Sequence, residues 1–318
     1  MRDFSHGLGM RSANGFLPVP EAGRRTFRDP QVQARFERDG YVVVTALDEH
    51  QARVARSRAV AAMAPEPAVN DPQGALYGTL FDPERRLAGE RLGDELLTPL
   101  LDSLLDDYRH EGGYVVAKLP GSPRLDMHQH QPVTFDIYEP SVHCWLTLDD
   151  VNSSAGALRV VPGSHALLRH VQSFATPPFF ASFAERLEQH YAIDLDMRAG
   201  EAVIFERSLL HGSAPNLSPT SRLRVLGTAI PSESRLCILA EQQPGRFEAL
   251  EVGGAFIDPT LYCIADANRA ALKSAGVIDN RNAQLTEPEF AALLESGAKV
   301  RPGFDPIDTL RSSVAGAA

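Results

Sequence analysis

The feature that most constrains this chain is a series of short apolar or alternating runs between residues 113 and 231. Turn-forming clusters of Gly, Pro, Asn and Asp separate the runs, which read YVVAKLP, SVHCWLTLDD, GALRVVPGS, EAVIFE and RLRVLGTAIP. Runs of this length, rich in β-branched residues, are typical of strands rather than helices. Several such strands at close spacing predict a sandwich or barrel. The segment 166–192, which contains FFASFAERLEQHY, interrupts the series and is predicted to be a helical excursion.

Helical patterns dominate the N-terminal third of the chain. Residues 1–30 are rich in Gly, Pro and Arg and are predicted to form a loose arm. Residues 31–65 have the pattern of a helix that ends at Gly40, a strand, and a second helix with Asp48 as its N-cap. The Leu-rich stretch 84–110 is predicted to be another helix.

The strand pattern weakens after residue 231, and helices are predicted at 265–275 and 286–296. This tail is too short and too thinly apolar to build a core of its own. We therefore predict one domain of mainly β structure with flanking helices. Its parts are an arm with helices (1–112), a barrel core (113–231, insertion at 166–192) and a helical extension that packs on the barrel (232–318).

Composition excludes several classes of function. The 318 residues include 43% hydrophobic residues, enough for a sizeable core. Lys and Arg number 31 against 41 Asp and Glu, a net charge of −10, which argues against a nucleic-acid partner. The three cysteines are far apart and form no CxxC pair, which predicts no disulfide framework and fits a reducing cytoplasm. No apolar run is long enough to predict a membrane span or a signal peptide.

The stretch Asp126-Met127-His128-Gln129-His130 is the richest in chemistry. Side chains alternate along a strand, so His128 and His130 would point the same way and could chelate a metal. A third ligand must come from elsewhere, and His211, after the strand-like run EAVIFERSLL, is the candidate. Imidazole suits iron, copper, nickel and zinc alike, so the ligand type does not select the metal. The alternative is that these histidines are ordinary core or surface residues.

Two arginines follow the third histidine. Arg222 lies eleven residues after His211. Arg224 follows two residues later and shares the strand face of Arg222 if RLRVL is a strand. A buried guanidinium near a metal needs an anion, and a dicarboxylate that chelates the metal at one end and pairs with Arg at the other would supply it. The alternative is that both arginines lie on the surface of an edge strand.

Over roughly residues 27–230 the chain resembles the phytanoyl-CoA dioxygenase family of iron(II)- and 2-oxoglutarate-dependent oxygenases. The resemblance rests on FRDPQVQARFERDGYVVVTAL, on the HQH stretch, on SVHCWLTLDDVNSSAGALRVVPGSH and on GEAVIFERSLLHGSAPNLSPTSRLRV. Each piece is weak alone, but the combination is specific. The resemblance implies a double-stranded β-helix, which is a jelly-roll core of the cupin type.

The resemblance also implies roles for individual residues. His128 and His211 match metal ligands, and Pro162-Gly163-Ser164-His165 matches a structural turn, so His165 is predicted to serve folding. The residues that match the cosubstrate site of the family are Arg222, Ser213, Gln129, Trp145 and, more loosely, Lys118. The implied cofactors are Fe(II), 2-oxoglutarate and O2. The implied reaction is oxidation of a C–H bond of a small organic metabolite, for example in natural-product biosynthesis.

One position departs from the family pattern. The family has a metal-binding Asp two residues after its first His, and this chain has His130 there. A three-His iron site, a ring that swings away from an open site, and a degraded site are the alternatives. Asp126, on the strand face of His128, and Asp136 are carboxylates that could substitute.

Three functional hypotheses follow: a 2-oxoglutarate oxygenase, a three-His oxygenase that does not use 2-oxoglutarate, and a metal-free binding protein. His143 is predicted to face the site or the core, whereas His110, His170 and His190 are predicted to be solvated. Substrate specificity is predicted to lie in the loops 67–80, 131–140 and 166–192. The helical tail offers a contact for a homodimer.

Overall fold

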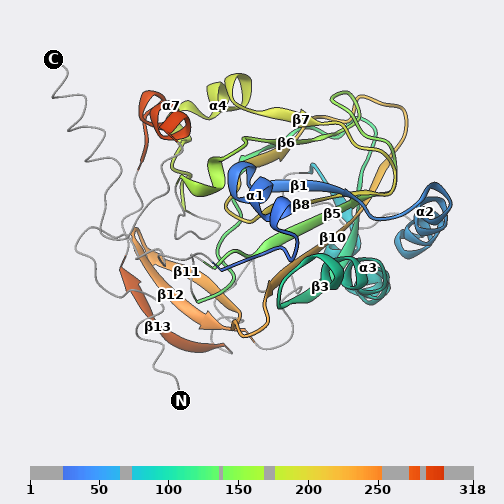
Figure 1. Ribbon diagram of the computed structural model, residues 1–318, viewed down its shortest axis with the longest axis horizontal. Coiled ribbons are helices and arrows are strands. Elements are labelled where there is room, and N and C mark those ends of the chain that lie inside the picture. The colour runs from blue at the N-terminus through green and yellow to red at the C-terminus, as the bar shows by residue number, and fades with distance from the viewer. Residues whose placement is uncertain are drawn as a thin grey trace.

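Strands between residues 41 and 231 pair into two antiparallel sheets (Figure 1). The six-stranded sheet has the order β1-β8-β5-β10-β3-β2, and the four-stranded sheet has the order β4-β9-β6-β7. The strands of the first are β1 (Tyr41–Thr45), β2 (Tyr77–Gly78), β3 (Tyr108–Lys118), β5 (Val142–Thr147), β8 (Glu201–Glu206) and β10 (Arg222–Pro231). Those of the second are β4 (Leu125–His128), β6 (Leu158–Val160), β7 (Ile193–Leu195) and β9 (His211–Ser213). This computed structural model describes residues 24–64, 74–135, 139–167, 176–252, 272–279 and 284–296.

The two sheets bury their inner faces against each other. One apolar cluster joins side chains of the six-stranded sheet, such as Val116, Val203 and Phe205, with Leu158 and Val160 of the four-stranded sheet. Successive strand residues point to opposite faces, so the alternate residues of the six-stranded sheet are left for its outer face. The predicted double-stranded β-helix with flanking helices is therefore confirmed.

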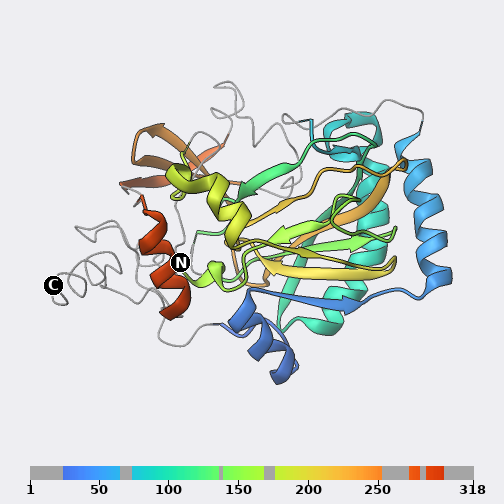
Figure 2. The same cartoon turned by 90° about the horizontal axis from the view of Figure 1, so that it is seen from above.

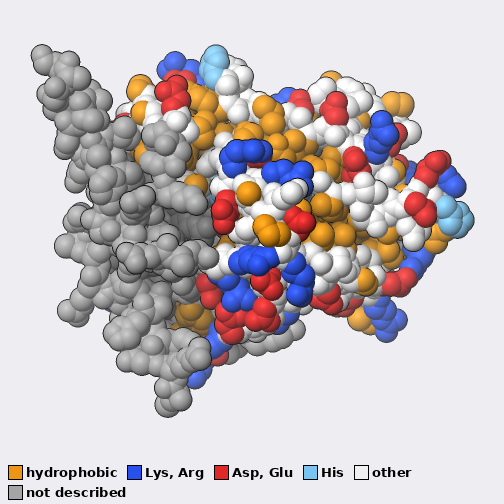
Figure 3. Space-filling view, in the orientation of Figure 1, with side chains coloured by type: hydrophobic (Ala, Val, Ile, Leu, Met, Phe, Trp, Pro, Cys, Tyr) orange, Lys and Arg blue, Asp and Glu red, His pale blue; other side chains and the backbone are white. Residues whose placement is uncertain are grey.

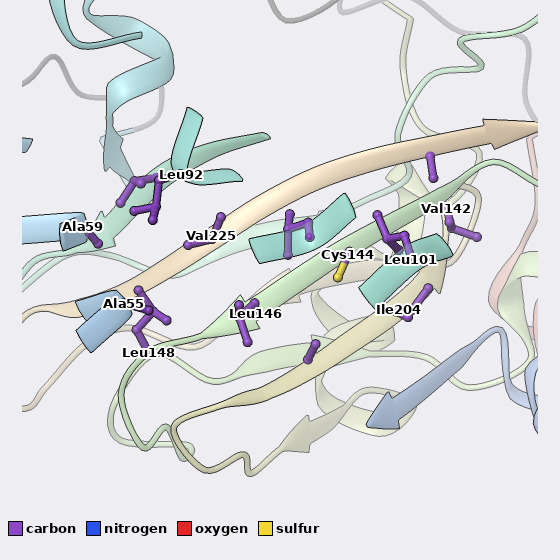
Figure 4. Packing of buried hydrophobic residues seen from close by; sticks show 14 of the residues in the cluster. Ala55, Ala59, Leu92, Leu101, Val142, Cys144, Leu146, Leu148, Ile204 and Val225 are labelled. Atoms are coloured by element: carbon purple, nitrogen blue, oxygen red, sulfur yellow. The ribbon is translucent and has the colours of Figure 1, made fainter. Parts of the chain in front are cut away.

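Helices cover the outer face of the six-stranded sheet (Figure 2). They are α2 (Glu49–Met63) and α3 (Pro83–Leu104), while α1 (Pro30–Asp39) leads into β1. Ala55 and Ala59 of α2 and Leu92 and Leu101 of α3 pack on the sheet; this cluster also includes the labelled residues Val142, Cys144, Leu146, Leu148, Ile204 and Val225 (Figure 4). The contact of α2 and α3 with the six-stranded sheet forms a second hydrophobic layer, which holds this sheet in place.

The helix boundaries follow from local capping. Asp29 caps α1 by accepting from the amides of Gln31 and Val32, and Gly40 ends the helix in the left-handed conformation with φ 83°. Asp48 and Gln51 form a reciprocal capping box at the start of α2. Both predicted boundaries are therefore confirmed.

The predicted boundary between an N-terminal helical part and the barrel is wrong. The helix expected over 84–110 ends at Leu104, and its last residues already belong to β3. Strand β1 pairs with β8, so residues far before 113 complete the six-stranded sheet. The loop expected over 67–80 contains β2, which pairs with β3. Local pattern missed these pairings because the partners lie far away in sequence.

The part after residue 231 is not simply helical. Strands β11 (Cys237–Gln243), β12 (Arg246–Glu251) and β13 (Lys273–Asp279) form a separate three-stranded sheet. The helix expected at 265–275 is wrong for 273–275, which lie in β13, and 265–271 fall outside the described residues. The runs CILAEQQ and RFEALE are too short to show a clear strand pattern. The strands that they form are stabilised mainly by pairing with each other.

The helix expected at 286–296 is confirmed as α7 (Glu287–Ser296). Its residues Phe290 and Leu293 pack against Phe179 and Phe183 of the segment 166–192. That segment contains the expected helical excursion as α4 (Ala184–His190), preceded by a short 3-10 turn at Ala181–Phe183. Residues 168–175 within it fall outside the described residues.

On the face seen in Figure 3, basic and acidic side chains are interspersed among the described residues rather than gathered by sign. This distribution gives no electrostatic footprint for nucleic acid on that face. None of the helices in the described part of the chain is long and apolar enough to cross a membrane.

Candidate metal centre

His128 and His211 lie side by side on β4 and β9, at the β4 edge of the four-stranded sheet. His128 ends β4 and His211 begins β9, and the two are register partners on these neighbouring antiparallel strands. Their ring centroids are 4.3 Å apart. A Cβ on the intervening Gly212 would lie 2.5 Å from the carbonyl oxygen of Leu125, so the close approach of the strands requires glycine.

Both rings are oriented by backbone carbonyls. Nδ1 of His128 lies 2.8 Å from the carbonyl oxygen of Asp126, and Nδ1 of His211 lies 2.8 Å from that of Leu209. A carbonyl accepts, so each Nδ1 carries the proton, and Nε2 is the ring nitrogen whose lone pair suits a ligand role. Nε2 of His211 is buried and has no hydrogen-bond partner among the described residues.

His130 completes the group. It lies two residues beyond the end of β4, where its backbone N–H donates to the carbonyl oxygen of Arg207 at 2.9 Å. Its ring centroid is 4.8 Å from that of His211, and its Nε2 is also buried without a partner in the described structure. The potential ligand atoms of His128, His130 and His211 all lie within 4.8 Å of one another. The structure therefore brings together the three histidines that the sequence singled out.

Burial favours the neutral form of His130 and of His211. Burial lowers the pKa of His211 well below its ordinary value, and the nearby His128 lowers it further. Burial also lowers the pKa of His130, with further contributions from His143 and His211. Together with His128, the imidazoles of His130 and His211, whose buried Nε2 atoms have no hydrogen-bond partner among the described residues, form a donor set that fits a divalent transition metal such as iron.

Asp126 does not act as the substitute carboxylate that strand alternation suggested. Its side chain is exposed and forms a 2.9 Å ion pair with Arg124, and its carbonyl group binds His128 instead. The pairing of β4 with β9 shifts register between Leu125 and His128, which breaks the alternation on which the expectation depended. Asp136 lies outside the described residues.

Three polar residues near the histidines, Ser213, Lys118 and Arg222, lie close to one another. Ser213, two residues after His211, accepts a 2.9 Å hydrogen bond from Nζ of the fully buried Lys118. Arg222 is the register partner of Lys118 on β10 and is half-buried. Its Nε is buried without a hydrogen-bond partner in the part of the chain that the structure describes. Lys118 and Arg222 therefore lie on the adjoining strands β3 and β10, and Lys118 reaches across to Ser213 on β9 of the other sheet.

Arg224 is the more deeply buried of the two arginines, with 2% of its surface exposed. Its guanidinium lies 5.7 Å from the ring of Trp145 and donates to the carbonyl oxygen of Gly156. Burial lowers the pKa of Arg224 to about 10. One guanidinium nitrogen of Arg224 and the indole nitrogen of Trp145 have no partner among the described residues. The signal for Arg224 was its shared strand face with Arg222, but its depth could not be read from the sequence.

Other candidate residues have different surroundings. The amide of Gln129 donates to the carbonyl oxygen of Ser208 at 2.6 Å. His165 is buried in a 3-10 turn and contacts Gly40, as its predicted folding role requires. His190 is exposed as predicted, whereas the side chain of His110 on β3 is only 3% exposed rather than solvated. His170 lies outside the described residues.

The fold and the histidine group define a jelly-roll protein with a mononuclear, histidine-rich site that fits a metal. The sequence profile of the phytanoyl-CoA dioxygenase family matches residues 36–223, more than half of the chain. The chain therefore belongs to the phytanoyl-CoA dioxygenase family of iron(II)- and 2-oxoglutarate-dependent oxygenases.

Individual relatives are distant. Phytanoyl-CoA dioxygenase 1 of Oryza sativa subsp. japonica is 32% identical over 98 residues, which are 29% of this chain and 34% of that protein. The match thus spans about a third of the rice protein. The 2-oxoglutarate-dependent carbocyclase SnoK from nogalamycin biosynthesis has a TM-score of 0.50 at 18% identity, covering 65% of this chain and 86% of its own. The epimerase SnoN, also from nogalamycin biosynthesis, has a TM-score of 0.49 at 21% identity, covering 80% of this chain and 94% of its own.

Proposed function

We propose that this protein is an iron(II)- and 2-oxoglutarate-dependent dioxygenase that oxidises a C–H bond of a small organic metabolite through a three-His metal site. The observation that carries the proposal is the convergence of His128, His130 and His211 beside a group of interior cations. Membership of the family supports the same cofactors. Iron(II), when bound with 2-oxoglutarate and O2, supplies oxidation of unactivated C–H bonds.

The roles of the chain follow from charge. Three neutral imidazoles leave the full charge of a divalent metal uncompensated, where a carboxylate ligand would remove one unit. A dianionic 2-oxo acid balances that charge, and its distal carboxylate is suited to the guanidinium and ammonium groups of Lys118, Arg222 and Arg224. Ser213, held by Lys118, would position that carboxylate. The apolar inner faces of the two sheets exclude water from the reacting groups.

A second candidate is an oxygenase that uses the three histidines without 2-oxoglutarate. His130 favours it, because a third imidazole stands where the family has a carboxylate. Lys118, which donates to Ser213, and the buried Arg224 favour the first candidate, because a site with no anionic cosubstrate has no evident need for these interior cations. A metal-free binding protein is the third reading, and the unpaired ring nitrogens of His130 and His211 in the described structure speak against it.

The test is an anaerobic titration of the iron(II)-loaded protein with 2-oxoglutarate, followed by visible absorption. We expect a metal-to-ligand charge-transfer band for the wild type and none for His211→Ala, which should lose the metal. A well-folded, iron-loaded wild type that shows no band would contradict the use of 2-oxoglutarate. Substrate oxidation that consumes O2 without release of succinate would instead identify the second candidate.

A further inference from the structure

We propose that His143 is the residue that positions His130 as the third metal ligand, by packing its ring against the His130 ring. The proposal rests on the three-His site proposed above and concerns how this chain accommodates a histidine where its family has an aspartate. It names a positioning residue, because His143 belongs to none of the groups of side chains that could hold a metal in the described structure.

The need for such a residue arises from a difference between the three histidines. Backbone carbonyls orient the rings of His128 and His211 through Nδ1. Among the described residues, no hydrogen bond is made to either ring nitrogen of His130. The lone pair of an imidazole lies in the ring plane, so an unoriented ring would not aim its nitrogen at the metal. Something other than a hydrogen bond must orient His130.

His143 is the nearest ring to His130. Their centroids are 4.1 Å apart with an interplanar angle of 48°, closer than the 4.8 Å between His130 and His211. His143 lies on β5, on the inner face of the six-stranded sheet, opposite Phe205 of β8 and Thr228 of β10. Because His143 lies on a central strand, its side chain can provide a rigid support for His130, which lies beyond the end of β4.

The ring of His143 is itself held at both nitrogens. Arg207 donates an N–H to Nε2 of His143. A guanidinium cannot accept, so Nε2 is the acceptor and Nδ1 carries the proton, which it donates to the carbonyl oxygen of Gly227 at 3.2 Å. The lone pair of Nε2 is therefore engaged by Arg207, and His143 is fixed as a neutral support rather than a fourth ligand.

Arg207, which holds the ring of His143, also contacts the backbone at and beside His130. The carbonyl oxygen of Arg207 accepts from the backbone N–H of His130, and its guanidinium donates to the carbonyl oxygen of Gln131 at 3.3 Å. Both the backbone and the ring of His130 are thus located by one cluster of Arg207 and His143. A carboxylate at position 130 has a shorter side chain and no ring, so it would gain nothing from the ring of His143.

The experiment is a double-mutant cycle read out by Co(II) binding to the full-length apo-protein, followed by ligand-field absorption and competitive titration. Its members are the wild type, His143→Ala, His130→Ala and the double variant. We expect His143→Ala to weaken Co(II) binding about tenfold or more, as removal of groups that orient metal ligands does. Its Co(II) spectrum should resemble that of His130→Ala. In the His130→Ala background the same substitution should change affinity by less than about twofold.

His110→Gln is the matched control. His110 is also buried and also flanks Gly227, but its contact lies with Thr98 and the helical layer rather than with His130. It should bind Co(II) like the wild type. His143→Gln, which can still accept from Arg207 and donate to Gly227, guards against loss of the fold and should also lose affinity.

Two results would overturn the proposal: wild-type affinity in both His143 variants, or an equal loss in the presence and absence of His130. Failure of the metal site itself gives a different result. In that case Co(II) binding would not respond to His128→Ala or His211→Ala, and the proposed function would fall together with this inference.

Discussion

A single glycine lets the strands that carry His128 and His211 approach each other. Gly212 lies between His211 and Ser213, the serine that accepts from Lys118, and it faces the backbone of β4. An added methyl group would meet the carbonyl oxygen of Leu125 at 2.5 Å and the sulfur of Met127 at 3.1 Å. Backbone cannot give way as a flexible side chain can, so the strands would have to separate.

Gly212→Ala should therefore weaken metal binding by separating the two register-paired histidines. We expect a loss of about tenfold in Co(II) affinity, similar to the loss of an orienting group, and a destabilisation of about 1–3 kcal/mol from overpacking. Competitive Co(II) titration and urea unfolding measure the two effects. A variant that is destabilised but binds Co(II) like the wild type would show that strand separation does not reach the site.

The two arginines of β10 are predicted to differ in their effect on 2-oxoglutarate. Arg224→Met removes a buried charge and should weaken the binding of 2-oxoglutarate by roughly 10–100-fold. This is the loss that corresponds to a charge-assisted hydrogen bond of about 1.5–3 kcal/mol. Arg222→Met removes a half-buried one and should cost less than about fivefold. Trp145 is the single tryptophan and lies over Arg224, so quenching of its fluorescence reports binding directly.

Melting temperatures serve as the control for both arginine variants. The larger loss in Arg222→Met would mean that the arginine matched by family resemblance binds the carboxylate and that Arg224 only supports Trp145 and Gly156. Metal-loaded protein without oxygen is the sample, so that affinity is measured apart from turnover.

At the scale of elements, α3 is seated on the sheet by a contact between two glycines. A Cβ on Gly93 of α3 would lie 2.6 Å from the Cα of Gly113 on β3, and Gly113 likewise has no room for a side chain. The helix and the strand therefore approach backbone to backbone. Because β3 also carries Lys118 at its end, the seating of α3 bears on the site.

Gly93→Ala tests this seating. In an isolated helix the change would stabilise by about 1 kcal/mol, because alanine is the better helix former. Here the clash with Gly113 should outweigh that gain and give a net destabilisation of about 1–3 kcal/mol. Denaturant unfolding monitored by circular dichroism measures it. A stabilised variant would show that α3 can shift away from β3 without penalty.

At the scale of the whole molecule, buried histidines couple stability to pH. His110 is the clearest case because it lies away from the metal site. Burial lowers its pKa in the folded state, and Asp94 only partly opposes this. The unfolded chain therefore binds a proton more readily, and the stability contributed by neutral His110 is present above pH 6.5 and is lost as pH falls toward the folded pKa.

His110→Gln should accordingly flatten the dependence of stability on pH. In the wild type this residue contributes a slope of up to about 1.4 kcal/mol per pH unit below about pH 6.5, which the variant lacks. Urea unfolding of the apo-protein at a series of pH values from about 7.5 to 5.5 measures it. Parallel profiles for the two proteins would contradict the assignment of a depressed pKa to His110.

Much of this architecture was readable in the sequence, because it depends on local chemistry. Caps at Asp29 and Asp48, the strand rhythm, and the spacing of His128, His130 and His211 each follow from neighbouring residues. The three-stranded sheet after residue 231 was not readable, because its short strands take their stability from pairing with one another. Strand β2 and the end of α3 were missed for the same reason.

What the sequence by itself determined is the kind of protein and the residue types of its site: a jelly-roll core, three histidines and nearby cations, with a histidine in place of the usual carboxylate. Only the tertiary structure decided how these residues are held. The depth of Arg224, the outward turn of Asp126 at the register shift between β4 and β9, and the ring contact between His130 and His143 each depend on contacts between segments apart in sequence. Burial and side-chain direction are properties of packing, and packing is settled only when the two sheets close on each other.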